Sequence, residues 1–73
     1  MPPPDLPEPG RYRHFKGGEY ELFALARHSE TEEWHAVYRP IDGDGTWWVR
    51  PAAMFSEMVE RDGLRGPRFE RVG

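Results

Sequence analysis

The residues best suited to chemistry in this sequence are cationic, histidine and hydroxyl side chains, together with two adjacent tryptophans. Cationic and hydroxyl groups donate hydrogen bonds to phosphate, and an indole ring stacks on a nucleobase. The candidate binding residues are His14, Lys16, His28, Ser29, Glu30, Thr31, Trp47, Trp48, Arg50 and Arg68. If folding brings them to one cleft, they suit an anionic, planar ligand. We therefore expect a non-enzymatic module that binds a nucleotide or single-stranded nucleic acid.

The run His-Ser-Glu-Thr at residues 28–31 also has a purely structural interpretation. Side chains of serine, glutamate and threonine hydrogen-bond nearby backbone amides, and such bonds cap a tight turn between two strands. Catalysis is the weaker alternative, because neighbouring residues of a strand point to opposite faces and His28 is then a poor base for Ser29. Glutamates at the tip of a loop in so small a domain are too solvated for acid–base work. We expect no catalytic residues.

A metal site is a further alternative. The residues that could supply its ligands are His14, His28 and His35, with Glu30 or Glu33. A two-residue turn at Thr31-Glu32 would place His28 opposite His35, a pairing that allows shared zinc coordination. The chain has no cysteine and no histidine motif typical of a zinc site. We therefore expect neither a metal ion nor another cofactor.

The adjacent tryptophans support a second hypothesis, a protein or peptide partner. Trp47 and Trp48 would lie on one strand, so one ring faces in and the other faces out. The outward ring is either covered by a turn at residues 51–55 or left as a recognition surface. Trp48, Tyr38, Asp42 and Asp44 could build an aromatic cage with an acidic rim, which suits a methylammonium group or a peptide arginine. The alternative function is thus a peptide-interaction module.

Four runs rich in aromatic and β-branched residues are expected to form the strands that position these side chains. They cover residues 11–15, 19–28, 34–39 and 46–50, and Asp42-Gly43-Asp44-Gly45 is a hairpin turn signal between the last two. The second run also has the apolar spacing of a helix. As a strand, it places Tyr20, Leu22, Ala24 and Ala26 on one face and Phe23 and Leu25 on the other.

Residues 51–73 are expected to form a helical turn at residues 52–55 and one hairpin. In that hairpin, residues 58–61 pair with residues 68–72 across the turn signal Asp62-Gly63, and a helix over residues 56–61 is the alternative. Together the elements predict a mainly β fold, a small SH3-like β-barrel of five to six short strands with one short helical turn. An isolated sheet with one packed helix is the second possibility.

The chain has 73 residues, a net charge of −3 and no cysteine, so no disulfide can stabilise it. We expect one domain at residues 10–73, preceded by a disordered proline-rich tail at residues 1–9. The chain has no basic arm, so its charge does not favour non-specific binding to nucleic acid. No apolar run approaches the ~20 residues of a membrane span, and no signal pattern opens the chain, so we expect a soluble cytoplasmic protein. An exposed strand edge would permit a homodimer.

Four blocks of the sequence resemble a known family. They are Tyr-Arg-His-Phe-Lys-Gly at residues 12–17, His-Ser-Glu-Thr at residues 28–31, Trp-Val-Arg-Pro at residues 48–51 with Met54 and Phe55, and Pro-Arg-Phe at residues 67–69. Their order and spacing are similar to those of domain of unknown function 1653 (DUF1653), a family of small bacterial proteins. The resemblance implies a compact, mostly β domain that usually stands alone, and it implies no activity.

Overall fold

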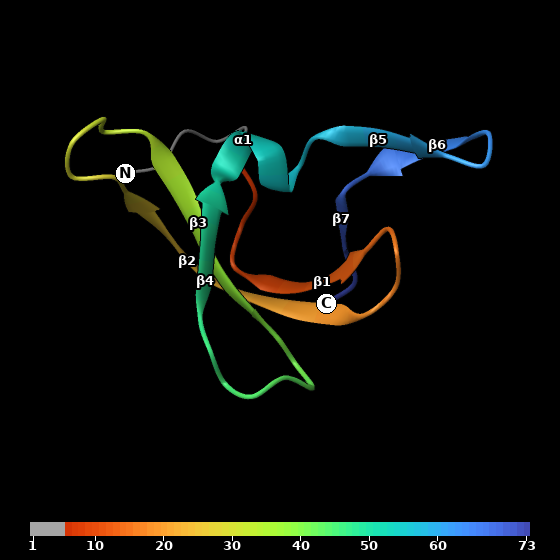
Figure 1. The fold of residues 1–73 in the computed structure, drawn as a ribbon, viewed down its shortest axis with the longest axis horizontal. Coiled ribbons are helices and arrows are strands. Elements are labelled where there is room, and N and C mark those ends of the chain that lie inside the picture. The colour runs from red at the N-terminus through yellow and green to blue at the C-terminus, as the bar shows by residue number, and fades with distance from the viewer. Residues whose placement is uncertain (1–5) are drawn as a thin grey trace.

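The structure is a computed structural model, and it describes residues 6–73. These residues form strands and one short helix, in the order β1 (Gly10–His14), β2 (Glu19–Arg27), β3 (Trp34–Pro40), β4 (Trp48–Pro51), α1 (Ala52–Phe55), β5 (Met58–Arg61), β6 (Leu64–Pro67) and β7 (Phe69–Arg71). Five strands form one antiparallel sheet in the order β4-β3-β2-β1-β7, while β5 and β6 form a separate hairpin (Figure 1).

The mainly β fold with one helical turn is confirmed, but the SH3-like barrel is not, because the sheet does not close. Strands β4 and β7 lie at opposite edges of the five-stranded sheet and do not pair with each other. The hairpin of β5 and β6 pairs within itself and extends to one side of the sheet (Figure 1). The isolated sheet with one packed helix, which was the second possibility, describes this arrangement better.

The predicted hairpin of residues 58–61 with residues 68–72 is wrong in its second arm. Asp62 and Gly63 have φ angles of 54° and 78°, so they form a two-residue turn of the type that joins adjacent strands directly. Arg61 consequently pairs with Leu64, and β6 takes the place expected for the later segment. The segment that follows, β7, pairs instead with β1, with Phe69 opposite His14.

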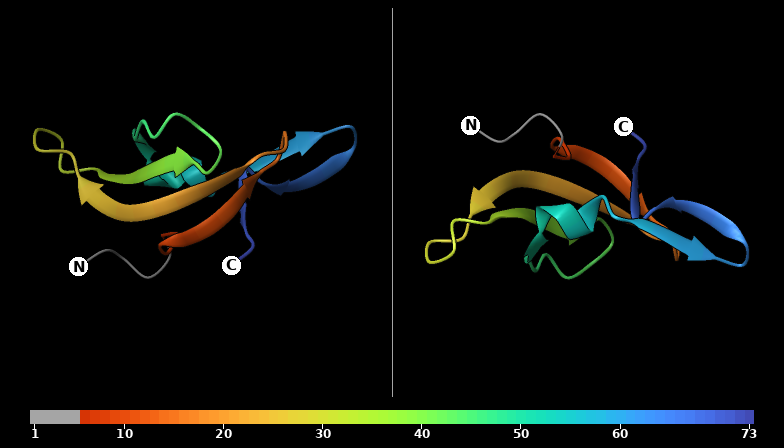
Figure 2. Two further views of the ribbon diagram at one scale, coloured as in Figure 1. Left: turned by 90° about the horizontal axis from the view of Figure 1, so that it is seen from below. Right: turned by 90° about the horizontal axis from the view of Figure 1, so that it is seen from above.

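The core lies on one face of the sheet, beneath α1. Its buried apolar residues are Tyr12, Leu22, Ala36, Tyr38, Ala52, Phe55 and Phe69. The ring of Phe55, at the end of α1, is fully buried and stacks on the ring of Phe69 with 4.1 Å between centroids. Figure 2 shows α1 lying against the curved sheet. One aromatic side chain from the helical turn therefore packs against β1, β3 and β7 together.

Strand β2 carries a β-bulge that changes which of its residues are buried. The register with β3 shifts between Leu22 and Ala24, so Phe23 is the extra residue. Beyond the bulge, Leu25 rather than Ala24 faces the core, contrary to the strict alternation expected from the sequence. Phe23 is 62% exposed on the opposite side of the sheet, which we call the outer face.

The predicted tail is described only in part, because residues 1–5 lie outside the described residues. Glu8 contacts the domain in two ways: its carbonyl oxygen accepts a hydrogen bond of 2.7 Å from the Tyr12 hydroxyl, and its carboxylate pairs with Arg71 at 3.0 Å. Among residues 6–73, no helix is long and apolar enough to cross a membrane.

Candidate binding site

One aromatic side chain from each strand of the five-stranded sheet contributes to a row across the face that α1 covers. This aromatic row consists of Phe69 on β7, His14 on β1, Tyr20 on β2, Tyr38 on β3 and Trp48 on β4. Ring centroids are 4.8 Å apart for His14 and Phe69, 6.0 Å for His14 and Tyr20, and 5.9 Å for Tyr20 and Tyr38. Trp48 is directly opposite Tyr38, so the two side chains leave the same face.

The members of the row differ in how far solvent can reach them. Phe69 and Tyr38 are buried and belong to the core. His14 and Tyr20 are half-buried, and Trp48 is 55% exposed. A ligand on this face can therefore reach three rings of the row, while the other two support them from below.

Arg50 extends its guanidinium group over the row. It lies two residues after Trp48 on β4, so both side chains project from the same face. Its Nε atom donates a hydrogen bond of 3.2 Å to the Tyr38 hydroxyl, and its guanidinium lies 5.7 Å from the centre of the Phe69 ring. None of the carboxylates described here lies within ion-pair distance of Arg50. Its terminal nitrogens are therefore open to an external anion.

Two further cations gather around the ring of Phe15, which follows β1. The Lys16 Nζ atom and the Arg68 guanidinium lie 5.8 Å and 5.9 Å from the centre of this ring. Arg68 also pairs with Glu57 at 3.0 Å, and its Nε atom is buried without a hydrogen-bond partner. The His14 ring lies 4.7 Å from the same Phe15 ring. Lys16, Arg68 and His14 therefore all lie around Phe15.

His14 belongs to the aromatic row and also lies beside the cations. Its Nδ1 atom accepts a hydrogen bond of 3.1 Å from the Lys16 backbone amide, so the proton of the neutral ring is on Nε2. Burial lowers the pKa of His14, and the charges of Arg50, Arg68 and Lys16 lower it further. A neutral His14 thus offers one N–H donor. We call His14, Lys16, Arg50 and Arg68 the donor cluster.

The candidate residues 28–31 do not join this cluster. They form the loop between β2 and β3, whereas Lys16 lies in the turn at the other end of β2 (Figure 1). Nine residues of strand separate the two loops by roughly 25 Å. The sequence had left open whether these residues converge, and Tyr20 was not among the predicted binding residues. The recurrence of one aromatic residue per strand is the signal that could have found it.

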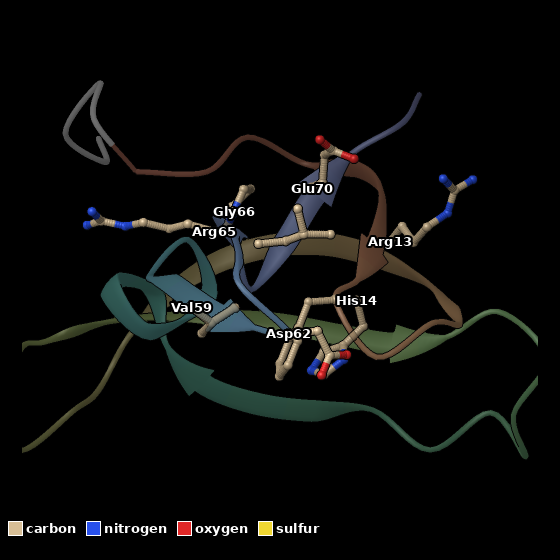
Figure 3. A pocket seen from close by; sticks show the side chains of 10 residues that line it. Arg13, His14, Val59, Asp62, Arg65, Gly66 and Glu70 are labelled. Carbon is tan, nitrogen blue, oxygen red and sulfur yellow. The ribbon is translucent and has the colours of Figure 1, made fainter.

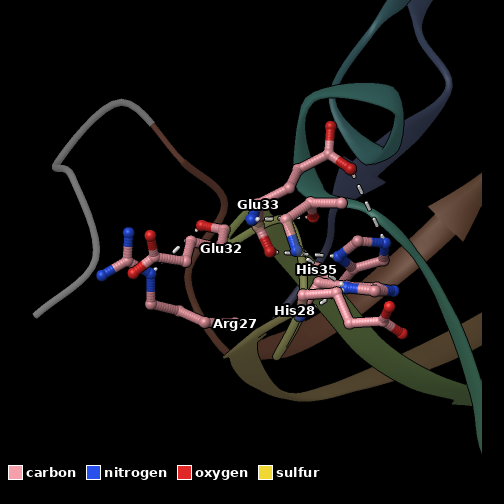
Figure 4. A network of polar contacts seen from close by, with 7 residues as sticks. Arg27, His28, Glu32, Glu33 and His35 are labelled. Atoms are coloured by element: carbon pink, nitrogen blue, oxygen red, sulfur yellow. Dashed lines mark hydrogen bonds and ion pairs between the residues drawn. The ribbon is translucent and has the colours of Figure 1, made fainter.

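Residues 28–33 have the contacts of a capped turn, as in the structural interpretation, but the capping atoms belong to His28 and Thr31, whereas the sequence pointed to Ser29, Glu30 and Thr31. The Nδ1 atom of His28 accepts hydrogen bonds from the amides of Glu30 and Thr31, at 3.1 and 3.2 Å. The Thr31 hydroxyl accepts one from the Glu33 amide at 3.2 Å (Figure 4). The His28 ring that was considered for catalysis thus stabilises the loop backbone.

The histidine pair expected across this loop is offset. His28 pairs through its backbone with Glu33, while His35 is opposite Ala26, because the loop contains four residues rather than two. The rings of His28 and His35 are still 5.5 Å apart. Within residues 6–73, however, no three histidine or carboxylate side chains form a group that could hold a metal ion.

Trp47 lies away from the aromatic row, on the outer face. Its ring is 5.2 Å from that of Phe23, and the Arg39 guanidinium lies 4.3 Å above it. The two tryptophans do diverge as expected. Of the two alternatives for the outward ring, the structure shows the exposed one, because Phe55 of the turn at residues 51–55 packs into the core while Trp47 and Trp48 stay 41% and 55% exposed.

The aromatic cage expected around Trp48 is not assembled. Tyr38 is buried, and its hydroxyl accepts the hydrogen bond from Arg50. The carboxylate of Asp44 accepts a hydrogen bond of 2.9 Å from the Thr46 amide. Hydrogen bonds from the Thr46 side chain and backbone lower the pKa of Asp44. Both groups therefore have structural roles in the loop and the core.

A cleft of about 430 Å³ lies beside the donor cluster, between β1, β7 and the hairpin of β5 and β6. His14 contributes to its wall, but Arg50, Lys16 and Arg68 do not. Figure 3 shows the labelled lining residues, which include Arg13, Asp62, Arg65 and Glu70. Because charges of both signs line this cleft, it suits a polyanion less well than the aromatic row does.

The sequence and the fold were compared with those of known proteins. A family model described as a protein of unknown function (DUF1653) matches residues 10–71. The crystal structure of a DUF1653 protein from Bordetella bronchiseptica is similar to the chain, with 35% sequence identity and a TM-score of 0.82. That similarity covers 90% of this chain and 87% of the other. No curated protein matches the chain.

Proposed function

We propose that this chain, which belongs to the DUF1653 family, binds a nucleotide or single-stranded nucleic acid on the face that carries the aromatic row. The observation that supports the proposal is the position of the donor cluster beside three accessible rings. Phosphate binding requires hydrogen-bond donors, and base binding requires aromatic surface. This face supplies both within one sheet.

The residues have distinct roles in this proposal. Arg50 and Lys16 contact phosphate oxygens with charged donors, which form shorter and stronger hydrogen bonds than neutral ones. His14 donates its Nε2 hydrogen to the same anion. Trp48 and Tyr20 offer ring surface to the bases. Hydrogen bonds to phosphate position the ligand without reading its sequence, so we expect weak base preference.

The acidic net charge of the chain does not oppose such binding locally. Most surface arginines outside the donor cluster are neutralised by carboxylates. These ion pairs are Arg11 and Arg13 with Glu19, Arg39 with Glu21, and Arg71 with Glu8, at 3.0 to 3.6 Å. Arg50 has no such partner among the described residues, so its charge acts outward on an approaching anion.

The proposed activity is binding rather than turnover. Ser29, the nucleophile considered from the sequence, lies in the exposed loop between β2 and β3. The Nδ1 atom of His28, which would have to act as its base, is occupied by two backbone amides. A nucleophile needs a base within hydrogen-bond reach, and this loop supports a capped turn instead.

The test is a titration of fluorescently labelled single-stranded oligonucleotides, followed by anisotropy at low salt. Arg50→Ala is expected to weaken binding about tenfold or more, because it removes a charged hydrogen-bond donor. Arg39→Ala is the matched control, since it removes the same charge from the outer face. Dispersion of amide NMR signals confirms that both variants are folded. Equal affinity of the two variants, or no binding by the native chain, would contradict the proposal.

A second candidate function is protein binding through the outer face. Phe23 and Val49 are 62% and 65% exposed there, and Trp47 lies beside Phe23. Exposed apolar residues that cluster are typical of interaction surfaces. Phe23→Ala would then abolish the capture of a partner while leaving oligonucleotide affinity unchanged. Arg50→Ala would have the opposite effects.

A further inference from the structure

We infer that the ligand of the aromatic row is a strand of at least two nucleotides, with one base on Trp48 and neighbouring phosphates at the donor cluster. This inference rests on the proposed function and narrows its ligand class. A free mononucleotide with its base on Trp48 extends its phosphate only toward Arg50, whereas a strand also reaches the Lys16 and Arg68 cations at the other end of the row. The spacing, openness and charge of the face favour such a strand.

The spacing follows from the sheet. His14 on β1 and Trp48 on β4 are separated by β2 and β3. Three steps between neighbouring strands amount to about 14 Å. The Lys16 and Arg68 cations lie at the His14 end of the row, around Phe15. A ligand that contacts Trp48 at one end and these cations at the other must therefore be extended, as a short strand is.

Arg50 connects the two ends. It leaves β4 beside Trp48, but its guanidinium lies over Tyr38 and within 5.7 Å of the Phe69 ring, which the His14 ring also contacts. Two residues of a strand span about 7 Å. Arg50 is thus placed to hold the phosphate that follows a base stacked on Trp48.

The openness of the face also favours a strand. Trp48 is 55% exposed, and neither of two clefts on the surface contains Trp48 or Arg50. A base stacked on this exposed ring therefore makes a one-sided contact. Successive nucleotides that each make a one-sided contact can still sum to useful affinity, because binding the first raises the effective concentration of the next.

The decisive experiment compares chain length. Affinities of the native chain are measured for the mononucleotides dTMP and UMP and for the tetranucleotides dT4 and U4 at low salt. We expect tetranucleotides to bind at least tenfold more tightly. Similar affinity for dT4 and U4 would indicate recognition of bases and phosphates, whereas a preference for U4 would indicate an added contact with the ribose hydroxyl.

Two variants test the role of Trp48. Trp48→Ala is expected to weaken tetranucleotide binding about fivefold or more, because a stacked base contributes that much or more, and to reduce the advantage of tetranucleotides over mononucleotides. Trp47→Ala, on the outer face, is the matched control and should change neither affinity. Trp48→Phe keeps a ring and should restore most of the loss. The effect of salt should give a slope of log affinity against log salt of about −1.4 to −2.1, the range for two to three phosphate contacts.

The outcomes separate this inference from the proposed function. If mononucleotides bind as tightly as tetranucleotides and Trp48→Ala changes neither, while Arg50→Ala weakens both, the proposed function stands and the inference is wrong. If no nucleotide or oligonucleotide binds, both are wrong. Tighter binding of tetranucleotides than of mononucleotides, with this difference reduced in Trp48→Ala, supports both.

Discussion

His14 lies where the core of the protein meets its donor cluster. Its ring contacts Phe69, which is buried, and Phe15 and Tyr20, while three cations surround it. Burial and these positive charges hold the pKa of His14 below its ordinary value of 6.5. The ring is therefore a neutral donor at neutral pH, and protonation adds a fourth positive charge to a crowded site.

This pKa predicts how stability depends on pH. Between the lowered pKa of the folded state and 6.5, the unfolded chain binds more protons at His14 than the folded chain does. The free energy of unfolding should therefore fall as pH drops below 6.5. Above pH 6.5, His14 should not change the free energy of unfolding with pH. Urea unfolding at pH 7.5 and 5.5 measures the difference. His14→Gln should show a smaller loss on acidification, and an identical loss in both proteins would rule out this linkage.

Glu57 competes with any ligand for Arg68. The two side chains pair at 3.0 Å, so part of the positive charge of Arg68 is neutralised before an anion arrives. Glu57→Gln removes that competition and should raise oligonucleotide affinity about two- to fivefold, within the range for a partly exposed ion pair. Glu30→Gln, which makes the same change of charge in the remote loop, should have no such effect. A Glu57→Gln variant with native affinity would place Arg68 outside the contact surface.

At the scale of elements, the loop between β2 and β3 is stabilised by side chains but carries local strain. Glu32 has a φ angle of 61°, in the left-handed region that a residue with a Cβ atom adopts at a cost of about 1–2 kcal/mol. Glycine relieves this strain but loses more entropy on folding. Glu32→Gly should therefore raise the free energy of unfolding by up to about 1 kcal/mol.

Thermal unfolding measures this change. Glu30→Gly serves as the control, because Glu30 does not have a positive φ angle and gains nothing from glycine. Oligonucleotide affinity should be native in both variants, since the loop lies at the far end of β2 from Lys16. Destabilisation by Glu32→Gly would mean that contacts of the glutamate side chain outweigh the backbone strain.

The sequence predicts the strands better than it predicts what they bring together. The regions of β1 to β4 and the helical turn follow from local patterns and turn signals, which act over a few residues. These local patterns do not predict strand β6, because Gly66 and Pro67 are poor strand formers. The bulge at Phe23 has no local signal either.

The donor cluster needs pairings that local patterns do not specify. Arg50 reaches His14 only because β4 is paired with β3, and Arg68 precedes β7, which is paired with β1 across most of the chain length. His28 was grouped with these residues by type alone. The candidate residues were thus chosen for their side-chain chemistry, whereas strand order decides which of them are neighbours.

At the scale of the whole molecule, stability depends on a core that covers one face of an open sheet. The outer face leaves Phe23 and Val49 largely exposed, so apolar burial is concentrated beneath α1. A single core in a chain of this size rarely supplies more than about 3–5 kcal/mol, and no cysteine is present to add a disulfide. The loss of one central ring is therefore comparable to the entire stability.

Phe55 is that ring. It is fully buried, stacks on Phe69, and meets Tyr12 and Tyr38 edge-on at 5.0 and 5.5 Å. Replacing a buried phenylalanine with alanine costs about 3–5 kcal/mol. Phe55→Ala should thus unfold the domain at 25 °C, seen as collapsed amide NMR dispersion, whereas Phe23→Ala at its exposed site should remain folded with nearly native stability. A cooperatively folded Phe55→Ala protein would show that the outer face or the hairpin of β5 and β6 contributes more stability than their exposure indicates. Because Phe69 and Tyr38 support the aromatic row from below, unfolding of Phe55→Ala would also remove the proposed binding surface as a unit.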